Sequence, residues 1–150
     1  MARVINLKNN ERFLAQYVGL RNRYALALLT HPVTIEQTKQ WINRSDIWIQ
    51  GLVQGKLLLG AAVLYGNKKG EITFFARFPG KGTGIRLLNA IESKAHDAGF
   101  CSIWGWTKYG NTAARKAFEK GGFRRCGATT RTYGNRSVRG IIYRKRLAVS

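Results

Sequence analysis

Three glycines, Gly80, Gly82 and Gly84, occupy alternate positions directly after a segment that alternates like a β-strand. Glycine lets the backbone adopt positive φ and approach a ligand closely, and successive N–H groups can then converge on an anion. Apolar residues recur at helical spacing from Ile85 onward, so the glycines lead into a helix N-terminus, which attracts phosphate. This stretch favours phosphate binding, and the alternative is a glycine-rich turn without a ligand.

Two familiar phosphate-binding patterns do not match this spacing. The Walker A loop requires Gly-Lys-Ser/Thr at the start of the helix, which is absent here. The dinucleotide fingerprint places its later glycines at plus two and plus five, whereas Gly80 is followed by glycines at plus two and plus four. The spacing therefore argues against an ATP loop and against a Rossmann site.

A second segment, from Asn111 to Phe123, reads N-T-A-A-R-K-A-F-E-K-G-G-F. It resembles the N-x-x-A-x-x-x-Y-x-x-x-G-F segment of the GNAT superfamily of CoA-dependent N-acyltransferases. In that family an R/Q-x-x-G-x-G/A motif precedes it, and the matching residues here are Pro79-Gly80-Lys81-Gly82-Thr83-Gly84. The two segments occur in the family's order and at its distance, and the resemblance covers Val53 to Leu147.

The resemblance implies a site for acetyl-CoA or another acyl-CoA, closed by the second segment. It assigns cofactor binding to Phe78, Gly80, Lys81, Gly82, Thr83, Gly84, Asn111 and Phe118. The sequence departs from the family at two positions. Pro79 replaces the usual Arg or Gln, and Phe118 replaces the tyrosine that protonates the departing thiolate in many members.

Acyl transfer to an amine requires a neutral amine, a donor to the oxyanion and a proton for the thiolate. Glu71 is the carboxylate nearest the predicted cleft and is the candidate base, although it could equally be an ordinary residue at the start of a strand. A backbone N–H near Phe78 is the expected oxyanion donor. Because Phe118 cannot donate a proton, Tyr109 is the candidate acid, with Tyr133 and Tyr143 as further hydroxyls.

Periodicity and turn residues predict the element order β-α-α-β-β-β-α-β-α-β-β. The first helix is expected from Asn9 or Asn10 to Leu29, and a second starts with a capping box at Thr34. The strand before the glycines is expected to run from Glu71 to Phe78. This order is that of a GNAT domain, and it predicts a single α/β domain over residues 1–150, with a mixed, mostly antiparallel sheet flanked by helices.

The chain carries 26 Lys and Arg against 7 Asp and Glu, a net charge of +19. No acidic residue follows Glu119, so the basic excess concentrates in the C-terminal hairpin. Such a surface attracts polyanions, and we expect an acidic or nucleic-acid-associated amine acceptor. Two alternatives remain: a non-catalytic nucleic-acid-binding protein on the same scaffold, and a small-molecule amine acetyltransferase whose charge has no bearing on its acceptor.

No apolar run is long enough to span a membrane, and the N-terminus lacks the apolar core of a signal peptide. A cytoplasmic protein without a membrane span is expected, and a homodimer is left open. Cys101 and Cys126 lie in strand-like runs without metal-ligand spacing, so we expect buried structural cysteines and no metal site.

Overall fold

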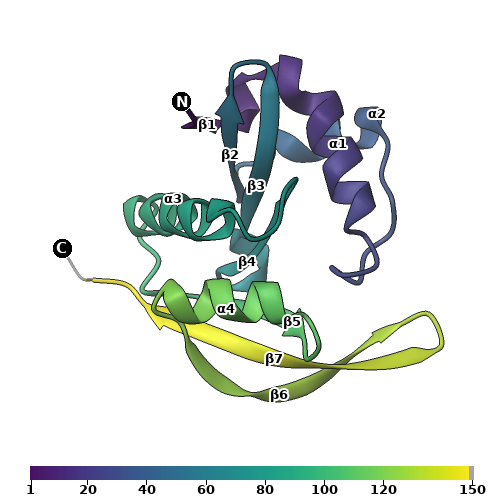
Figure 1. Cartoon of the computed structure of the whole chain (residues 1–150), viewed down its shortest axis with the longest axis vertical. Helices are drawn as coiled ribbons and strands as arrows, with labels where there is room; N and C mark the ends of the chain where they lie inside the picture. Colours follow the sequence, from purple (N-terminus) through teal and green to yellow (C-terminus); the bar gives the residue numbers. More distant parts are fainter. Residues whose placement is uncertain (149–150) are drawn as a thin grey trace.

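A computed structural model describes residues 1–148, which form one seven-stranded sheet with helices on both faces (Figure 1). The elements along the chain are β1 (Arg3–Asn6), α1 (Leu14–Arg23), α2 (Ile35–Ile42), β2 (Ile47–Gln54), β3 (Leu57–Tyr65), β4 (Glu71–Ala76), α3 (Thr83–Asp97), β5 (Ser102–Lys108), α4 (Thr112–Lys120), β6 (Arg124–Tyr133) and β7 (Arg136–Arg146). The predicted order and the mixed, mostly antiparallel sheet are confirmed.

The sheet has the strand order β1-β2-β3-β4-β5-β7-β6, with β4 and β5 as its parallel pair. These two strands share a single registered pair, Glu71 with Trp104, and then diverge. The end of β4 is therefore unpaired on the side facing β5, which leaves a V-shaped gap between the two strands.

Helices cover both faces of the sheet, and each pair buries its own core (Figure 1). On the face covered by α1 and α2, the core includes Phe13, Tyr17 and Phe75. On the face covered by α3 and α4, it includes Leu88 and Phe118. Successive side chains of a strand point to opposite faces, so the odd-numbered side chains of β4 face α1 and the even-numbered ones face α3 and α4.

The first helix is shorter than predicted, because α1 ends at Arg23 rather than near Leu29. Two short 3₁₀ turns, Leu7–Asn9 and Glu11–Phe13, precede it. The Asn22 side chain exchanges two hydrogen bonds of 2.8 Å with the backbone of Val33. These bonds hold the loop that follows α1 against the helix. The prediction from apolar periodicity was too long because such a contact between distant residues cannot be recognised from local spacing.

Caps at two other helices agree with the sequence. Thr34 and Gln37 form the predicted capping box at the start of α2. Gly99, with φ +88°, follows the last turn of α3 in the left-handed region, as expected of a glycine after a helix.

Both cysteines are exposed, so the expectation of burial is wrong. Cys101 lies just before β5 rather than within it. Cys126 is the extra residue of a β-bulge in β6, between Arg125 and Gly127. Edge strands commonly carry such bulges, and β6 is an edge of this sheet.

The bulge also changes which arginines of β6 share a face. Without it Arg125 and Arg131 would point to the same side, as alternation along an unbroken strand predicts. The extra residue shifts the alternation by one. Arg131 therefore lies over Trp106, whereas Arg125 lies over Tyr109 near α4.

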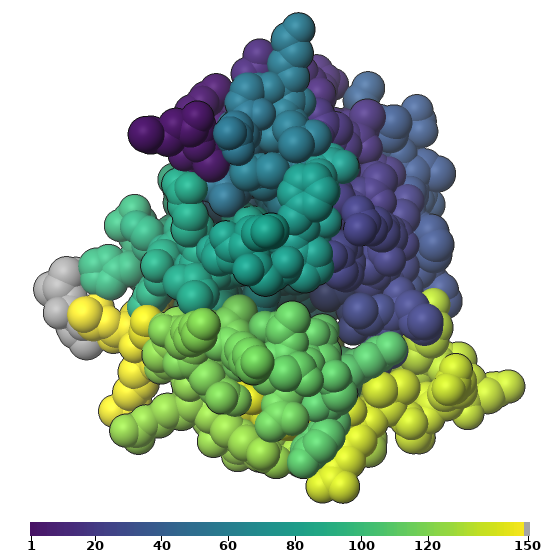
Figure 2. Space-filling model, in the orientation of Figure 1, coloured from purple at the N-terminus to yellow at the C-terminus, as the bar shows by residue number. Residues whose placement is uncertain are grey.

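The tip of the β6–β7 hairpin lies beside the loop between α1 and α2, as Figure 2 shows. The Tyr133 hydroxyl donates a hydrogen bond of 3.2 Å to the Thr30 carbonyl oxygen, and the Tyr133 ring packs against His31. The C-terminal hairpin and the N-terminal helices thus meet on the face of the sheet where Glu71 points.

Candidate active site

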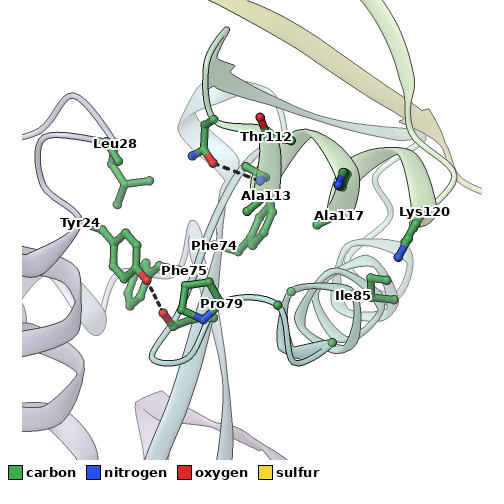
Figure 3. Close-up of a pocket in the computed structure, with 18 residues that line it drawn as sticks. Tyr24, Leu28, Phe74, Phe75, Pro79, Ile85, Thr112, Ala113, Ala117 and Lys120 are labelled. Atoms are coloured by element: carbon green, nitrogen blue, oxygen red, sulfur yellow. Dashed lines mark hydrogen bonds between the residues drawn. The ribbon is translucent and has the colours of Figure 1, made fainter.

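Two cavities lie beside β4. The larger, of about 480 Å³, opens where β4 and β5 diverge (Figure 3). Its walls come from the end of β4, the glycine loop, the first turn of α3, one side of α4 and the segment that follows α1. The lining residues are Tyr24, Ala27, Leu28, Phe74–Ala76, Pro79, Gly80, Gly82, Gly84, Ile85, Asn111–Ala114, Lys116, Ala117 and Lys120. The two sequence segments that predicted a cofactor site therefore meet in one cavity.

The backbone of the glycine loop is accessible from this cavity. Gly80 and Gly82 have φ of +81° and +78°, and no atom lies within 4 Å of the place where either would carry a Cβ. No side chain caps the first turn of α3, so its N–H groups are free to bind an anion. The loop fits a pyrophosphate group, because it offers unblocked donors at a helix N-terminus.

Gly84 is required for a different reason. A Cβ on Gly84 would lie 3.2 Å from Phe74 and 3.4 Å from Ala117. The third glycine therefore allows α3 to pack closely against β4 and α4, because a larger residue would push these elements apart.

The α4 wall contributes two lysines that the motif comparison missed. Lys116 and Lys120 both line the cavity. They are four residues apart and therefore share one face of the helix, which is the signal that could have identified them. Asn111 accepts a hydrogen bond of 3.2 Å from the Ala114 N–H and so caps α4 (Figure 3).

At the end of β4, Ala76 directs its backbone into the cavity. The neighbouring Arg77 N–H donates to the Leu59 carbonyl oxygen at 2.7 Å across the β3–β4 ladder. Polar groups of successive residues in an antiparallel strand point to opposite sides, so the N–H and carbonyl of Ala76 face the gap. The Tyr24 hydroxyl donates to that carbonyl (Figure 3). The cavity therefore holds a free N–H and a tyrosine hydroxyl side by side.

Four of the predicted cofactor residues lie outside the cavity wall. Phe78 lies beyond the end of β4 and is 51% exposed, so Ala76 is the better-placed N–H donor. Lys81 is exposed, and Thr83 is buried beneath the first turn of α3. Phe118 is 2% exposed and stacks on Tyr143 at 5.1 Å, so it supports the site from below as a packing residue.

The predicted acid, Tyr109, does not line this cavity. Its ring is exposed and lies beneath the guanidinium groups of Arg115, Arg125 and Arg139. The Tyr143 hydroxyl is likewise engaged, because it donates to the Glu119 carboxylate at 2.8 Å. Tyr24 is the tyrosine that lines this cavity, and it is not among the hydroxyls expected from the sequence, Tyr109, Tyr133 and Tyr143.

A smaller cavity, of about 130 Å³, lies against the opposite face of β4 and contains Glu71. Its lining residues are Tyr17, Arg21, Leu28–Thr30, Tyr65, Lys68, Glu71, Thr73, Phe75 and Arg131. Leu28 and Phe75 line both cavities. The two cavities are therefore adjacent near the end of β4, with these two side chains as a shared wall.

Glu71 is 4% exposed and accepts a hydrogen bond of 2.7 Å from the Arg131 guanidinium. Arg131 in turn lies 4.7 Å from the centre of the Trp106 ring. Burial raises the pKa of the Tyr65 hydroxyl above its ordinary value, so this group is a proton donor rather than a base in the cavity. The cavity thus combines one paired carboxylate with hydroxyl groups and basic side chains.

Comparisons with known proteins agree with this geometry. The model of the GNAT acetyltransferase family matches residues 14–123. Among solved structures, an N-acetyltransferase from Staphylococcus aureus Mu50 has a TM-score of 0.86 at 19% identity, with 99% of each chain covered. Ribosomal-protein-alanine N-acetyltransferase from Brucella melitensis has a TM-score of 0.83 at 19% identity, with 98% of this chain and 99% of that chain covered.

A phosphinothricin acetyltransferase from Sinorhizobium meliloti, solved with AcCoA, has a TM-score of 0.82 at 14% identity, with 97% of this chain and 88% of that chain covered. Among curated proteins, none matches the chain significantly by sequence. Within residues 1–148, no helix combines the length and the hydropathy that a membrane crossing requires. The family model covers most of the chain, including the glycine loop and α4, and the chain therefore belongs to the GNAT family as an acyl-CoA-dependent N-acetyltransferase.

Proposed function

We propose that the protein transfers an acetyl group to an amine held in the smaller cavity, and that the acceptor is acidic or associated with an acid such as nucleic acid. The observation that carries the proposal is that the two cavities are adjacent and share Leu28 and Phe75 as lining residues. One cavity has the donors that a CoA pyrophosphate requires, and the other has the buried carboxylate. An amine entering from the Glu71 side would reach a thioester lying along the end of β4.

Bound acetyl-CoA would supply an acyl thioester, and the chain would bind and polarise it. Its phosphates would be held by the free N–H groups of Gly82–Gly84 and by the side chains of Lys116 and Lys120. The Ala76 N–H would donate to the thioester carbonyl oxygen as negative charge develops on it. We assign the Tyr24 hydroxyl to protonate the leaving sulfur because it lies in this cavity beside Ala76. Its proton, donated to the Ala76 carbonyl oxygen in the free protein, would turn to the sulfur during the reaction.

Glu71 would accept the amine proton through an intermediate group. Glu71 and Phe75 are four positions apart, which is about 13 Å along a strand, longer than a carboxylate can span directly. Thr73 lies between them on the same face and lines the same cavity. Its hydroxyl, or a water molecule in the cavity, would relay the proton to the carboxylate.

Replacing Glu71 by Gln tests this assignment, because Gln keeps the shape and removes the proton acceptor. We expect kcat for acetyl transfer to fall about 10²- to 10⁴-fold while acetyl-CoA binding persists. Glu92→Gln is the matched control, because Glu92 also pairs with a basic side chain, Lys145 at 2.9 Å, but lines neither cavity. A Glu71→Gln variant as active as Glu92→Gln would exclude Glu71 as the base.

The acidic character of the acceptor is supported by the β6–β7 hairpin. Among the described residues, six exposed arginines of this hairpin take part in no ion pair: Arg124, Arg125, Arg136, Arg139, Arg144 and Arg146. Arg124 and Arg144 are directly opposite each other in the sheet. Like charges so placed repel each other, and a bound polyanion would relieve that repulsion.

Titration of nucleic acid at several salt concentrations tests the polyanion part of the proposal. Replacing Arg124 and Arg144 by Gln should flatten the log–log salt dependence by up to about two units. The control removes the same charge from Arg3 and Arg12, near the opposite edge of the sheet. Absence of binding by the wild type at low salt would remove nucleic acid from the proposal and leave the acetyl transfer intact.

A further inference from the structure

The smaller cavity carries more positive than negative charge. Arg21, Lys68 and Arg131 line it together with a single carboxylate, Glu71. Arg131 is paired with Glu71. Within residues 1–148, Arg21 and Lys68 form no ion pair, so the cavity has an excess of two positive charges.

The basic side chains are held in place by contacts of their own. The Arg21 guanidinium donates to the Thr30 hydroxyl and to the His31 carbonyl oxygen, both at 2.9 Å. Lys68 places its ammonium 4.7 Å from the centre of the Tyr65 ring. Such preorganised donors bind an anion at little entropic cost, because they are already oriented.

An acceptor amine alone would be poorly matched to this charge. In its protonated form it would add a third positive charge to a cavity that already holds an excess of two. A carboxylate or phosphate on the same molecule would pair with the two unpaired basic residues through charge-assisted hydrogen bonds. The volume of about 130 Å³ limits the bound part to a small group.

The positions along β4 separate the two ends of such a molecule. Phe75 marks the end that adjoins the cofactor cavity, where the amine must react. Tyr65 pairs with Glu71 at the other end of the strand, and Lys68 follows Tyr65 in the adjoining turn. The amine would therefore lie toward Phe75, and the anionic group toward Lys68 and Arg21.

We propose that the smaller cavity selects a small primary amine that carries its own carboxylate or phosphate group, with Arg21 and Lys68 as the anion-binding residues. This inference rests on the proposed function, since it names the acceptor class for the same cavity. This anion site in the smaller cavity is separate from the basic surface of the β6–β7 hairpin. The cavity would bind the anionic group of the acceptor itself, whereas the hairpin would bind a larger polyanion associated with the acceptor.

Acetyl transfer to matched pairs of amines tests the inference. One series compares unbranched ω-amino carboxylates with alkylamines of equal chain length, and a second compares O-phosphoethanolamine with ethanolamine. The members of each pair differ in their anionic group, so the two series distinguish carboxylate from phosphate recognition. For the best pair we expect kcat/KM to be at least tenfold higher for the anionic amine, as two charge-assisted hydrogen bonds allow.

Lys68→Gln and Lys69→Gln form a matched pair of variants. Both positions are exposed and lose the same charge, but only Lys68 lines the cavity. Lys68→Gln should lower kcat/KM for the anionic amine about tenfold and for its neutral partner much less, so that the ratio falls. Lys69→Gln should keep the wild-type ratio.

The outcomes separate this inference from the proposed function. Equal or faster transfer to the neutral member of every pair would overturn the anionic selectivity and leave the transferase assignment standing. Equal ratios for Lys68→Gln and Lys69→Gln would also overturn it. If no amine in either series is acetylated, the assignment of the smaller cavity as the acceptor site fails. Calorimetry of the same anionic amines with the CoA-bound protein then tests the anionic selectivity separately, and absence of binding would overturn that selectivity.

Discussion

Replacing Gly82 by alanine should weaken acetyl-CoA binding much more than it destabilises the fold. Gly82 has φ +78° and precedes the first residue of α3. An L-residue in the left-handed region costs about 1–2 kcal/mol. No atom lies within 4 Å of the added Cβ, so no steric penalty follows within the protein itself.

The expected magnitudes follow from these two facts. A loss of about 1–2 kcal/mol in a domain of this size lowers Tm by about 2–8 °C. The added methyl group occupies the open space where a phosphate would approach the loop, at the cost of a hydrogen bond to a charged oxygen worth about 1.5–3 kcal/mol. The Kd for acetyl-CoA should therefore rise about 10- to 100-fold.

Gly99→Ala is the control for the backbone penalty. Gly99 follows the other end of α3, has φ +88° and also has no atom within 4 Å of an added Cβ. Thermal unfolding should show similar losses for both variants, and titration calorimetry should show weakened acetyl-CoA binding for Gly82→Ala alone. If both variants bind acetyl-CoA with equal affinity, the glycine loop does not contact the cofactor.

Three further predictions follow from single side chains. Tyr24→Phe should lower kcat about 10²-fold or more with little change in the KM for acetyl-CoA, which steady-state kinetics would measure; an unchanged kcat would remove Tyr24 from the reaction. Gly105→Ala should lower the free energy of unfolding by about 1–3 kcal/mol in urea titrations, because its Cβ would lie 2.5 Å from the Phe118 ring. Burial raises the pKa of Tyr17, so above pH 10 only the unfolded state loses this proton and stability falls by up to about 1.4 kcal/mol per pH unit; Tyr17→Phe should flatten that decline in alkaline unfolding.

Local sequence patterns were enough to predict the element order and the glycine loop between β4 and α3. Alternation and helical periodicity act over a few residues, so β4, α3 and the capping box at Thr34 could be recognised without tertiary information. The glycine loop was recognisable for the same reason, since positive φ at Gly80 and Gly82 is a local requirement. The resemblance then joined the loop to Asn111, which caps α4.

The composition of the smaller cavity depends on contacts between distant parts of the chain. Glu71 and Arg131 are 60 residues apart, and Arg21 reaches the same cavity from α1. The bulge at Cys126 determines that Arg131 points toward Glu71, because one extra residue reverses the faces of a strand. No local pattern encodes such a shift before the strands pair. The same limit explains Tyr24 and Phe118: both are aromatic residues in segments that the sequence predicts to be helical, and only packing places one in the larger cavity and the other beneath it.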